Sequence, residues 1–544
     1  MNKKSSRATS YILIVLPLVI VIAIMTPRLI SPQFGLLDDG TMLLKVKEIL
    51  DGDLSFQDDL QAGRFRPLYW LYFAVIYAGA GMKPFWFFFS HLLLFLILLI
   101  QIRSLLKKMN ATDWQILLAS LLFIFSIPVV ENFYTLSKGE VLQLVFLLAA
   151  LLCLERLKQK HKAHWMNGVS SFLCILAAIL VKETAIIMTL VGGAWALYVL
   201  LKKEQFAKQE QTAHLVFFAS AVAAAIVFFF LREIWGAAPL TGGNYTERYT
   251  FSIQLILVKA TRWITLLAQY FHYLIPLAII GLICILRTES DDPNRAKRNF
   301  DWSIWSSFWV ISLIPWGYAE AYYLLPLSLG ISVLVGHAMP GVLETLRNSP
   351  KPLRYFLIGL SIVSGLLFLA TLPNYRTHAL TQLAIDRANH QMLMDAVELT
   401  PRNGRVFIGL DKENEYVQNI RYFLQEHLGR ADITLDYLSV ETLETLHWYS
   451  DSIVIIPYVS NLPNLIPRTG VDEYFTMTWA DIILHTMEGR QTGLRERHYD
   501  FRLSNLNLPV IACPIVGERG FCTDPDPILD LRPFSYGWDF YQVN

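Results

Sequence analysis

Apolar residues in this chain of 544 residues are gathered into long blocks. A membrane-spanning helix needs about 20 mostly apolar residues to cross about 30 Å of hydrocarbon. The first block, residues 11–25, follows a basic head. Further blocks lie near residues 84–104, 113–130, 141–155, 165–181, 185–201, 213–231, 270–286, 302–317, 322–343 and 354–373. The pattern predicts an all-α polytopic membrane protein with about eleven transmembrane helices.

Composition agrees with this interpretation. The chain is 54% hydrophobic and 17% charged, with a mean hydropathy of +0.41, whereas soluble proteins carry about 25% charged residues. The 46 basic residues are balanced by 45 acidic ones, so overall charge does not favour binding to nucleic acid. Five cysteines are too few for a disulfide scaffold, and no His and Cys residues have zinc-finger spacing.

Basic residues are concentrated in alternate loops. With the N-terminus in the cytoplasm, every predicted cytoplasmic segment is rich in Lys and Arg, as the positive-inside rule requires. These segments are residues 1–10, 103–108, 156–162, 202–208, 287–298 and 347–354. The rule holds if the apolar stretch 67–81, of about 15 residues, lies along the outer interface and does not cross. An odd number of spans then places residues 375–544 outside the cytoplasm.

The last part of the chain has a different pattern. Strand-like runs at 405–410, 433–437 and 452–458 alternate with helix-like runs at 414–428 and 440–448, which is typical of a small α/β domain. We therefore expect a transmembrane domain at 1–374, with a first outer loop at 27–83, and an extracytoplasmic α/β domain at 375–544. Cys513 and Cys522 are candidates for a short disulfide there.

Polar residues are densest in the first outer loop. Asp38 and Asp39 precede a helix-like run, so they are candidates for a helix cap and for an interfacial acid that serves as a general base. Arg64 and Arg66 flank an aromatic residue and are suited to binding a lipid-linked phosphate at headgroup level. The alternative is a solvated loop with turn-forming Asp and Gly.

Further polar residues are expected at the same membrane level. They are Lys138 and Glu140, Lys182 and Glu183, and Glu320 and Tyr322. Ionisable residues at such positions are costly unless they face a cavity. Neighbouring Lys and Glu could simply neutralise one another or extend to the interface. Their position on one side of the predicted membrane favours an outward-facing site.

These residues resemble the GT-C glycosyltransferases. The resemblance lies in the acidic pair after the first span, the run GRFRPLYW at residues 63–70, the hairpin around Lys182 and the run YYLLP at 322–326. It is closest to bacterial relatives of protein O-mannosyltransferases and to lipid A aminoarabinose transferases, and covers about residues 8–375. Two departures are an Asp-Asp pair where many members have Asp-Glu, and a single Pro67 where relatives often have two prolines.

The resemblance implies a function and roles for particular residues. The chain would transfer a hexosyl or pentosyl group, with inversion, from a polyprenyl-phosphate donor to an extracytoplasmic glycan, lipid or protein, in a bacterial plasma membrane. Asp38 or Asp39 would be the base, and Arg66 and Lys182, with Arg64, would bind the donor phosphate. No cofactor is required, although Asp38, Asp39 and Glu140 could hold a divalent metal.

Two other classes of function are considered. A transporter or lipid flippase often shows two related halves with helices broken near the bilayer midplane, and no such repeat is visible. A non-catalytic anchor for an outer assembly domain would not need so many spans. The variant Asp38→Asn discriminates among them, since an anchor would tolerate it and a transferase would lose most of its activity.

Overall fold

The computed structural model describes most of the chain. The described residues are 3–36, 38–53, 56–159, 164–237, 253–287, 293–316, 320–408, 415–437, 452–457, 472–476, 497–504 and 533–542. Cys513, Cys522 and the expected helix at 440–448 lie outside them.

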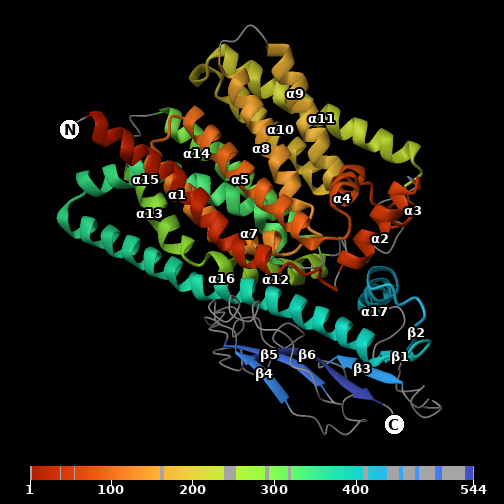
Figure 1. Ribbon diagram of the computed structural model, residues 1–544. Coiled ribbons are helices and arrows are strands. Elements are labelled where there is room, and N and C mark those ends of the chain that lie inside the picture. Colours follow the sequence, from red (N-terminus) through yellow and green to blue (C-terminus); the bar gives the residue numbers. More distant parts are fainter. Residues whose placement is uncertain are drawn as a thin grey trace.

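Helices make up the larger part of the molecule (Figure 1). The first part of the chain forms α1 (Lys3–Ile30), α2 (Asp39–Leu50), α3 (Gln57–Gln61), α4 (Pro67–Ala80), α5 (Pro84–Lys108), α6 (Asp113–Ile124), α7 (Ile127–Tyr134), α8 (Glu140–Leu157) and α9 (His164–Val181). The next part forms η1 (Glu183–Ile187), α10 (Met188–Leu201), η2 (Lys203–Gln205), α11 (Lys208–Ile234), α12 (Ile253–Phe271), α13 (Leu274–Arg287), α14 (Pro293–Leu313), η3 (Ala321–Leu324), α15 (Leu325–Asn348) and α16 (Lys351–Leu399).

Local sequence signals account for several helix boundaries. Pro67 and Pro84 begin α4 and α5, where the missing N–H of proline has no cost. At the start of α6, the backbone N–H of Thr112 donates to Gln115 Oε1 at 2.8 Å, and the N–H of Gln115 faces Thr112 Oγ1. This capping box ends the connection from α5.

The chain is a polytopic integral membrane protein. Among the described residues, five helices are long and apolar enough to cross a membrane, or up to seven if each of two bent helix pairs is one span. Three shorter apolar helices, Val15–Ile30, Pro67–Ala80 and Trp165–Val181, add to these. The predicted total of eleven spans is not reached by this criterion and stays a prediction.

One helix was missed by the hydropathy pattern. A span was expected at 270–286, but the structure breaks there, since Lys259–Phe271 and Leu274–Gly281 meet at 91°. Helix α12 precedes the break and carries polar residues that interrupt its apolar run. One of them, Lys259, is buried and donates to the carbonyl of Pro315 at 2.9 Å. A hydropathy window counts Lys259 as strongly polar, because the window contains no information about burial or hydrogen-bond partners.

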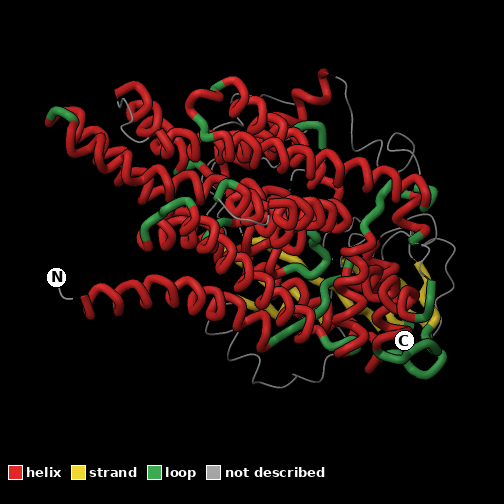
Figure 2. The backbone as a smooth tube through the Cα atoms, turned by 90° about the horizontal axis from the view of Figure 1, so that it is seen from above, coloured by secondary structure: helices red, strands yellow, loops and turns green. Residues whose placement is uncertain are grey.

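Helix α16 connects the helical part with the strands. It packs against α7 and α13 and also against β5 (Arg497–Ser504) and β6 (Pro533–Gln542), and Figure 1 shows it running between the two parts. Seen from above, the helices cover most of the strands (Figure 2). The helix continues through residue 375 without a break, so the expected domain boundary lies inside it.

The strands form one mixed sheet. The remaining elements are β1 (Arg405–Ile408), α17 (Glu415–Tyr422), the π-helical turn η4 (Phe423–His427), β2 (Thr434–Tyr437), β3 (Ile453–Pro457) and β4 (Asp472–Thr476). Their order is β2-β1-β3-β6-β5-β4, with β1 parallel to β2 and β3, β6 antiparallel to β3 and β5, and β4 parallel to β5. Strands were predicted at the positions of β1, β2 and β3, and these predictions are confirmed.

Helix α17 packs directly on α2. The amide oxygen of Asn419 accepts the backbone N–H of Thr41 at 3.0 Å. A Cβ atom on Gly40 would lie 2.4 Å from that oxygen, so only glycine allows this approach. The first-loop helix is thus held between the helical bundle and the C-terminal part.

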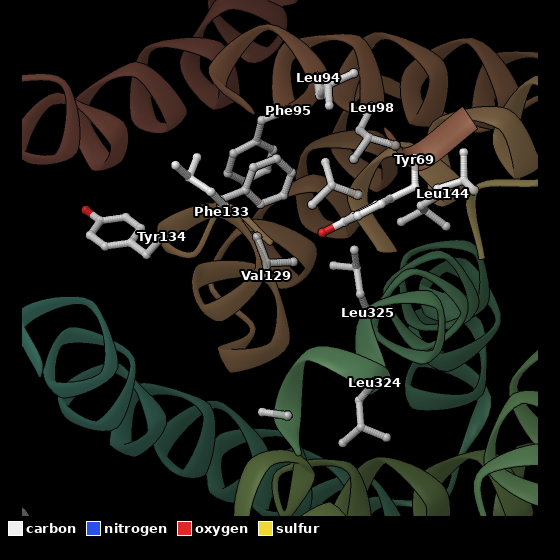
Figure 3. Close-up of a cluster of buried hydrophobic side chains, with 14 of the residues drawn as sticks. Tyr69, Leu94, Phe95, Leu98, Val129, Phe133, Tyr134, Leu144, Leu324 and Leu325 are labelled. Atoms are coloured by element: carbon white, nitrogen blue, oxygen red, sulfur yellow. The ribbon is translucent and has the colours of Figure 1, made fainter. Parts of the chain in front are cut away.

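A layer of buried apolar side chains packs between α4, α5, α7, α8 and α15 (Figure 3). Phe95 of α5 stacks on Phe133 of α7, with ring centroids 4.0 Å apart. Tyr69 of α4 lies in the same layer, and its hydroxyl donates to the carbonyl of Ser137 at 3.0 Å. Because close-packed interiors resist displacement, this layer gives the loops above it a rigid base.

Candidate functional site

Asp38 stands at the start of the first-loop helix. Helix α2 buries Met42, Leu43 and Val46 on one face, which fixes the helix against the bundle. Asp38 occupies the N-cap position, but its side chain makes no cap hydrogen bond, so the expectation that it caps the helix is wrong. Its φ is 70°, which is uncommon for a residue other than glycine and persists only where surrounding contacts hold it.

The carboxylate of Asp38 faces the loop that precedes α8. Its Oδ2 accepts the hydroxyl of Ser137 at 3.2 Å and lies 3.3 Å from Lys138 Nζ. The side chain of Asp38 is 39% exposed. A carboxylate that solvent can reach and that is paired with a cation is suited to accept a proton.

Asp39 has the opposite environment. The residue is 3% exposed, and its Oδ2 accepts the backbone N–H of Gly35 at 2.8 Å. Burial raises the pKa of Asp39 to about 8, and the nearby charge of Asp386 adds to the shift, while the bond from Gly35 opposes it. Asp39 therefore holds a proton more tightly than an ordinary aspartic acid does.

Arg66 is held by a partner that the sequence did not indicate. Its guanidinium donates to both oxygens of Asp59, at 2.8 and 3.2 Å, and the indole N–H of Trp70 donates to the same carboxylate at 2.6 Å. Burial opposes ionisation of Asp59, but the charge and hydrogen bonds of Arg66 outweigh it and keep the pKa of Asp59 below its ordinary value. Arg66 thus has a fixed, bidentate orientation.

Lys182 lies between α9 and η1 and forms an ion pair with the buried Glu140. Its ammonium lies 4.4 Å from the ring centroid of Tyr323 and 5.4 Å from that of Tyr322. Burial lowers the pKa of Lys182, although Glu140 opposes the shift. The ion pair and the aromatic faces fix its position.

Tyr322 is the point where the loops meet. Lys138 Nζ lies 4.4 Å from its ring centroid, so both lysines contact the same ring. The carbonyl of Tyr322 accepts from the amide of Asn132 on α7 at 2.9 Å. We call Asp38, Lys138, Glu140, Lys182 and Tyr322 the Tyr322 site.

The Arg64–Arg66 segment is tied to the same site. Glu183, next to Lys182, accepts the backbone N–H of Phe65 through Oε1 at 2.8 Å. Burial lowers the pKa of Arg64 to about 10, and the neighbouring charge of Arg66 adds to the shift, while Asp59 and Glu183 oppose it. Glu320 is exposed at the start of η3, two residues before Tyr322. The clusters that are far apart in the sequence therefore share one end of the helical bundle.

The carboxylates suggested for a metal do not converge. Asp38 faces Lys138, Asp39 faces Gly35 and Glu140 faces Lys182. Within the part of the chain that the structure describes, no group of three His, Cys, Asp or Glu side chains is placed to hold a metal ion. These residues do not fit a divalent cation.

Several residues near the site were missed by sequence reasoning. Arg28 and Asp386 form a buried ion pair next to Asp39, and Asp59 holds Arg66. Arg232 of α11 is buried and donates to the carbonyl of Gly63 at 3.2 Å. Buried Arg28 and Arg232 at the ends of apolar helices could have been singled out as costly charges. Nothing in the sequence pairs Arg28 with a residue 358 positions later.

No protein-family model and no curated protein matches the chain. Among solved structures, it is similar to ArnT from Cupriavidus metallidurans bound to undecaprenyl phosphate, with a TM-score of 0.46 and 11% identity over 82% of this chain and 93% of that one. It is also similar to an oligosaccharyltransferase from Archaeoglobus fulgidus in the apo form, with a TM-score of 0.42 and 15% identity over 76% and 64% of the two chains.

Proposed function

We propose that this protein is an integral membrane glycosyltransferase that moves a sugar from a polyprenyl-phosphate donor to an extracytoplasmic acceptor. The single observation that carries the proposal is the Tyr322 site, in which a solvent-reachable carboxylate is paired with Lys138, and Lys138 and Lys182 contact the same aromatic ring. Acceptor activation needs a base, and a departing phosphate needs cations. The site offers both at one end of the apolar helices.

The proposed reaction is a single displacement. Asp38 takes the proton of the acceptor hydroxyl or amine as that group attacks the anomeric carbon. The new bond forms on the face opposite the phosphate, the bond from the anomeric carbon to the phosphate oxygen breaks, and its electron pair stays on the phosphate. The sugar is therefore inverted. Because a polyprenyl phosphate leaves without a proton, one carboxylate suffices.

The two acidic residues have different proposed roles. Asp38 is the base because its carboxylate is exposed and paired with Lys138. Asp39 is buried, and its carboxyl group accepts the backbone N–H of Gly35, so it does not reach an acceptor. Of the two, only Asp38 meets the requirement that a general base reaches the proton it accepts.

Arg64, Arg66 and Lys182 are proposed to bind the donor phosphate. Asp59 uses two of the five donors of Arg66, so the others can reach a phosphate while the ion pair holds the guanidinium in place. Lys182 is fixed between Glu140 and the tyrosine rings. Such preorganised cations stabilise charge that develops on the leaving group.

The finer expectations belong to the same proposal. They are about eleven spans, a cytoplasmic N-terminus, an extracytoplasmic α/β part, a hexosyl or pentosyl group and a bacterial plasma membrane. Two observations support this orientation. Basic residues are concentrated in alternate loops, and the residues of the Tyr322 site lie together at one end of the helical bundle.

The test is transfer of label from a polyprenyl-phosphate pool that carries a radiolabelled sugar, in membranes with matched protein levels. Wild type should form a new labelled product, and Asp38→Asn should lower the rate by about 100-fold or more. Asp51→Asn is the matched control, because Asp51 is an exposed acid at the other end of α2. The proposal is overturned if wild type moves no label from hexose or pentose donors, or if Asp38→Asn is as active as Asp51→Asn.

A further inference from the structure

A second charged cluster lies behind the first-loop helix. We call Arg28, Asp39 and Asp386 the Arg28 cluster. Arg28 at the end of α1 is 1% exposed and forms an ion pair with Asp386 of α16. Its guanidinium also donates to the carbonyl of Tyr134 at 2.6 Å and lies 4.1 Å from the ring centroid of Phe88. A buried arginine with these partners is fixed in position.

The first loop is pressed against this cluster. The backbone N–H of Gly35 donates to Asp39 at 2.8 Å. A Cβ atom on Gly35 would lie 3.1 Å from Asp386 Oδ1 and 3.5 Å from Asp39 Oδ2. The end of α1, the start of α2 and the middle of α16 therefore meet around Asp39 and Asp386.

This meeting point adjoins Asp38. Asp38 has a positive φ and no cap bond to its own helix, so its direction depends on how its neighbours are held. Asp39 is held by the backbone N–H of Gly35, which also lies beside Asp386, whereas the Asp38 carboxylate is turned to Ser137 and Lys138. A one-residue step thus separates the anchored acid from the exposed one.

We propose that Asp386, acting through Arg28 and Asp39, is a positioning residue that holds Asp38 toward the acceptor. The inference rests on the proposed function, in which Asp38 is the base. Because α16 packs against β5 and β6, the same ion pair connects a helix that contacts the C-terminal sheet with the start of α2, which carries Asp38. Displacing a base by about 1 Å costs about 100-fold in rate.

The first experiment measures kcat and donor KM in purified full-length variants. Asp386→Asn should lower kcat by about ten- to hundredfold and leave donor KM within about threefold of wild type, since the phosphate-binding cations are not moved. Asp395→Asn is the matched control. Asp395 is also buried on α16 and accepts from a glutamine four residues earlier at 3.1 Å, as Asp386 does. This control should have the kcat of wild type.

A double variant separates positioning from folding. Asp386→Asn leaves Arg28 buried and without its carboxylate, which can prevent folding. Arg28→Met with Asp386→Leu removes both charges at similar volume. If the cluster positions Asp38, this double variant is folded but its kcat stays low. A folded double variant with the kcat of wild type overturns the proposal.

A chemical-labelling experiment tests the same geometry without measuring sugar transfer. Asp38→Cys is labelled with a membrane-impermeant maleimide, alone and combined with Arg28→Met and Asp386→Leu, and the chain with Asp38 intact measures labelling of the native cysteines. The labelling rate of Cys at position 38 should change by at least about threefold when the cluster is removed. An unchanged rate overturns the positioning role. A changed rate in a protein that transfers no sugar would overturn the proposed function alone.

Discussion

The Tyr322 site and the Arg28 cluster both pair acidic with basic side chains, but the two regions differ in exposure. In the Tyr322 site, Asp38 is 39% exposed and its lysine partner also contacts an aromatic ring. In the Arg28 cluster, Arg28 and Asp386 are each 1% exposed. Asp38 and Asp39, adjacent in the chain, fall on opposite sides of this division.

The comparison shows that burial and contacts decide what a carboxylate can do. An exposed ionised carboxylate can exchange a proton with a substrate, whereas a buried one is neutralised or paired and serves to fix the backbone. Asp38 and Asp39 are the same residue type in the sequence, but their surroundings in the structure differ. Four experiments test how far the two regions differ.

The largest effect is expected from breaking the buried ion pair. Asp386→Leu leaves Arg28 buried and unpaired with a carboxylate, and should lower the free energy of unfolding by about 3–5 kcal/mol. Adding Arg28→Met should restore most of this loss, because no uncompensated charge remains. Thermal unfolding in detergent measures both. A double variant as unstable as Asp386→Leu would show that the pair is not the source of the effect.

The pH dependence of stability distinguishes Asp39 from its neighbour. Its pKa in the folded protein, about 8, lies above its ordinary 3.8, so the folded state binds the proton more tightly. The free energy of unfolding therefore falls as pH rises from about 4 to about 8. Between pH 5 and pH 8, the free energy of unfolding of Asp39→Asn should rise relative to that of wild type by at least about 1.4 kcal/mol.

Unfolding of both proteins at the two pH values measures this difference. The groups that face Asp39 are Asp386, Asp38 and Arg28, and they are common to both proteins. A gap between variant and wild type that is equal at pH 5 and pH 8 would contradict a raised pKa of Asp39.

A smaller effect is expected at the phosphate-binding cations. Arg66→Lys replaces the two parallel bonds to Asp59 with a single point charge, so donor KM should rise about tenfold. Arg103→Lys is the control, since Arg103 pairs with Asp113 away from the Tyr322 site. Steady-state kinetics with varied donor checks this, and equal KM values in the two variants would exclude Arg66 from donor binding.

The smallest effect concerns the aromatic support of Lys182. Tyr323→Leu removes the ring that lies 4.4 Å from the ammonium, and a cation–π contact of about 0.5–1 kcal/mol corresponds to a two- to fivefold rise in donor KM. Tyr323→Phe keeps the ring and should behave as wild type. If Phe and Leu raise the KM equally, the hydroxyl of Tyr323 is responsible and the ring is not.

Much of the helical part could be predicted from hydropathy, because an apolar run of sufficient length has few alternatives to a membrane helix. The pattern missed α12, whose buried Lys259 finds a carbonyl partner, and it did not reveal the bend between α6 and α7. Such features depend on neighbours in space. Residue type and position also led to Asp38, Lys138, Lys182 and Tyr322, since polar groups at a membrane boundary are few and costly.

From the sequence alone, we could predict that apolar helices carry polar loops at one end, and which loops hold the acidic and basic residues. It left Asp38 and Asp39 equivalent. Only the tertiary structure separated them, by placing Asp386, 347 residues beyond Asp39, against Arg28 and Gly35. The physical reason is that ionisation depends on the charges and solvent around a carboxylate, and those are set by residues that are distant in the chain.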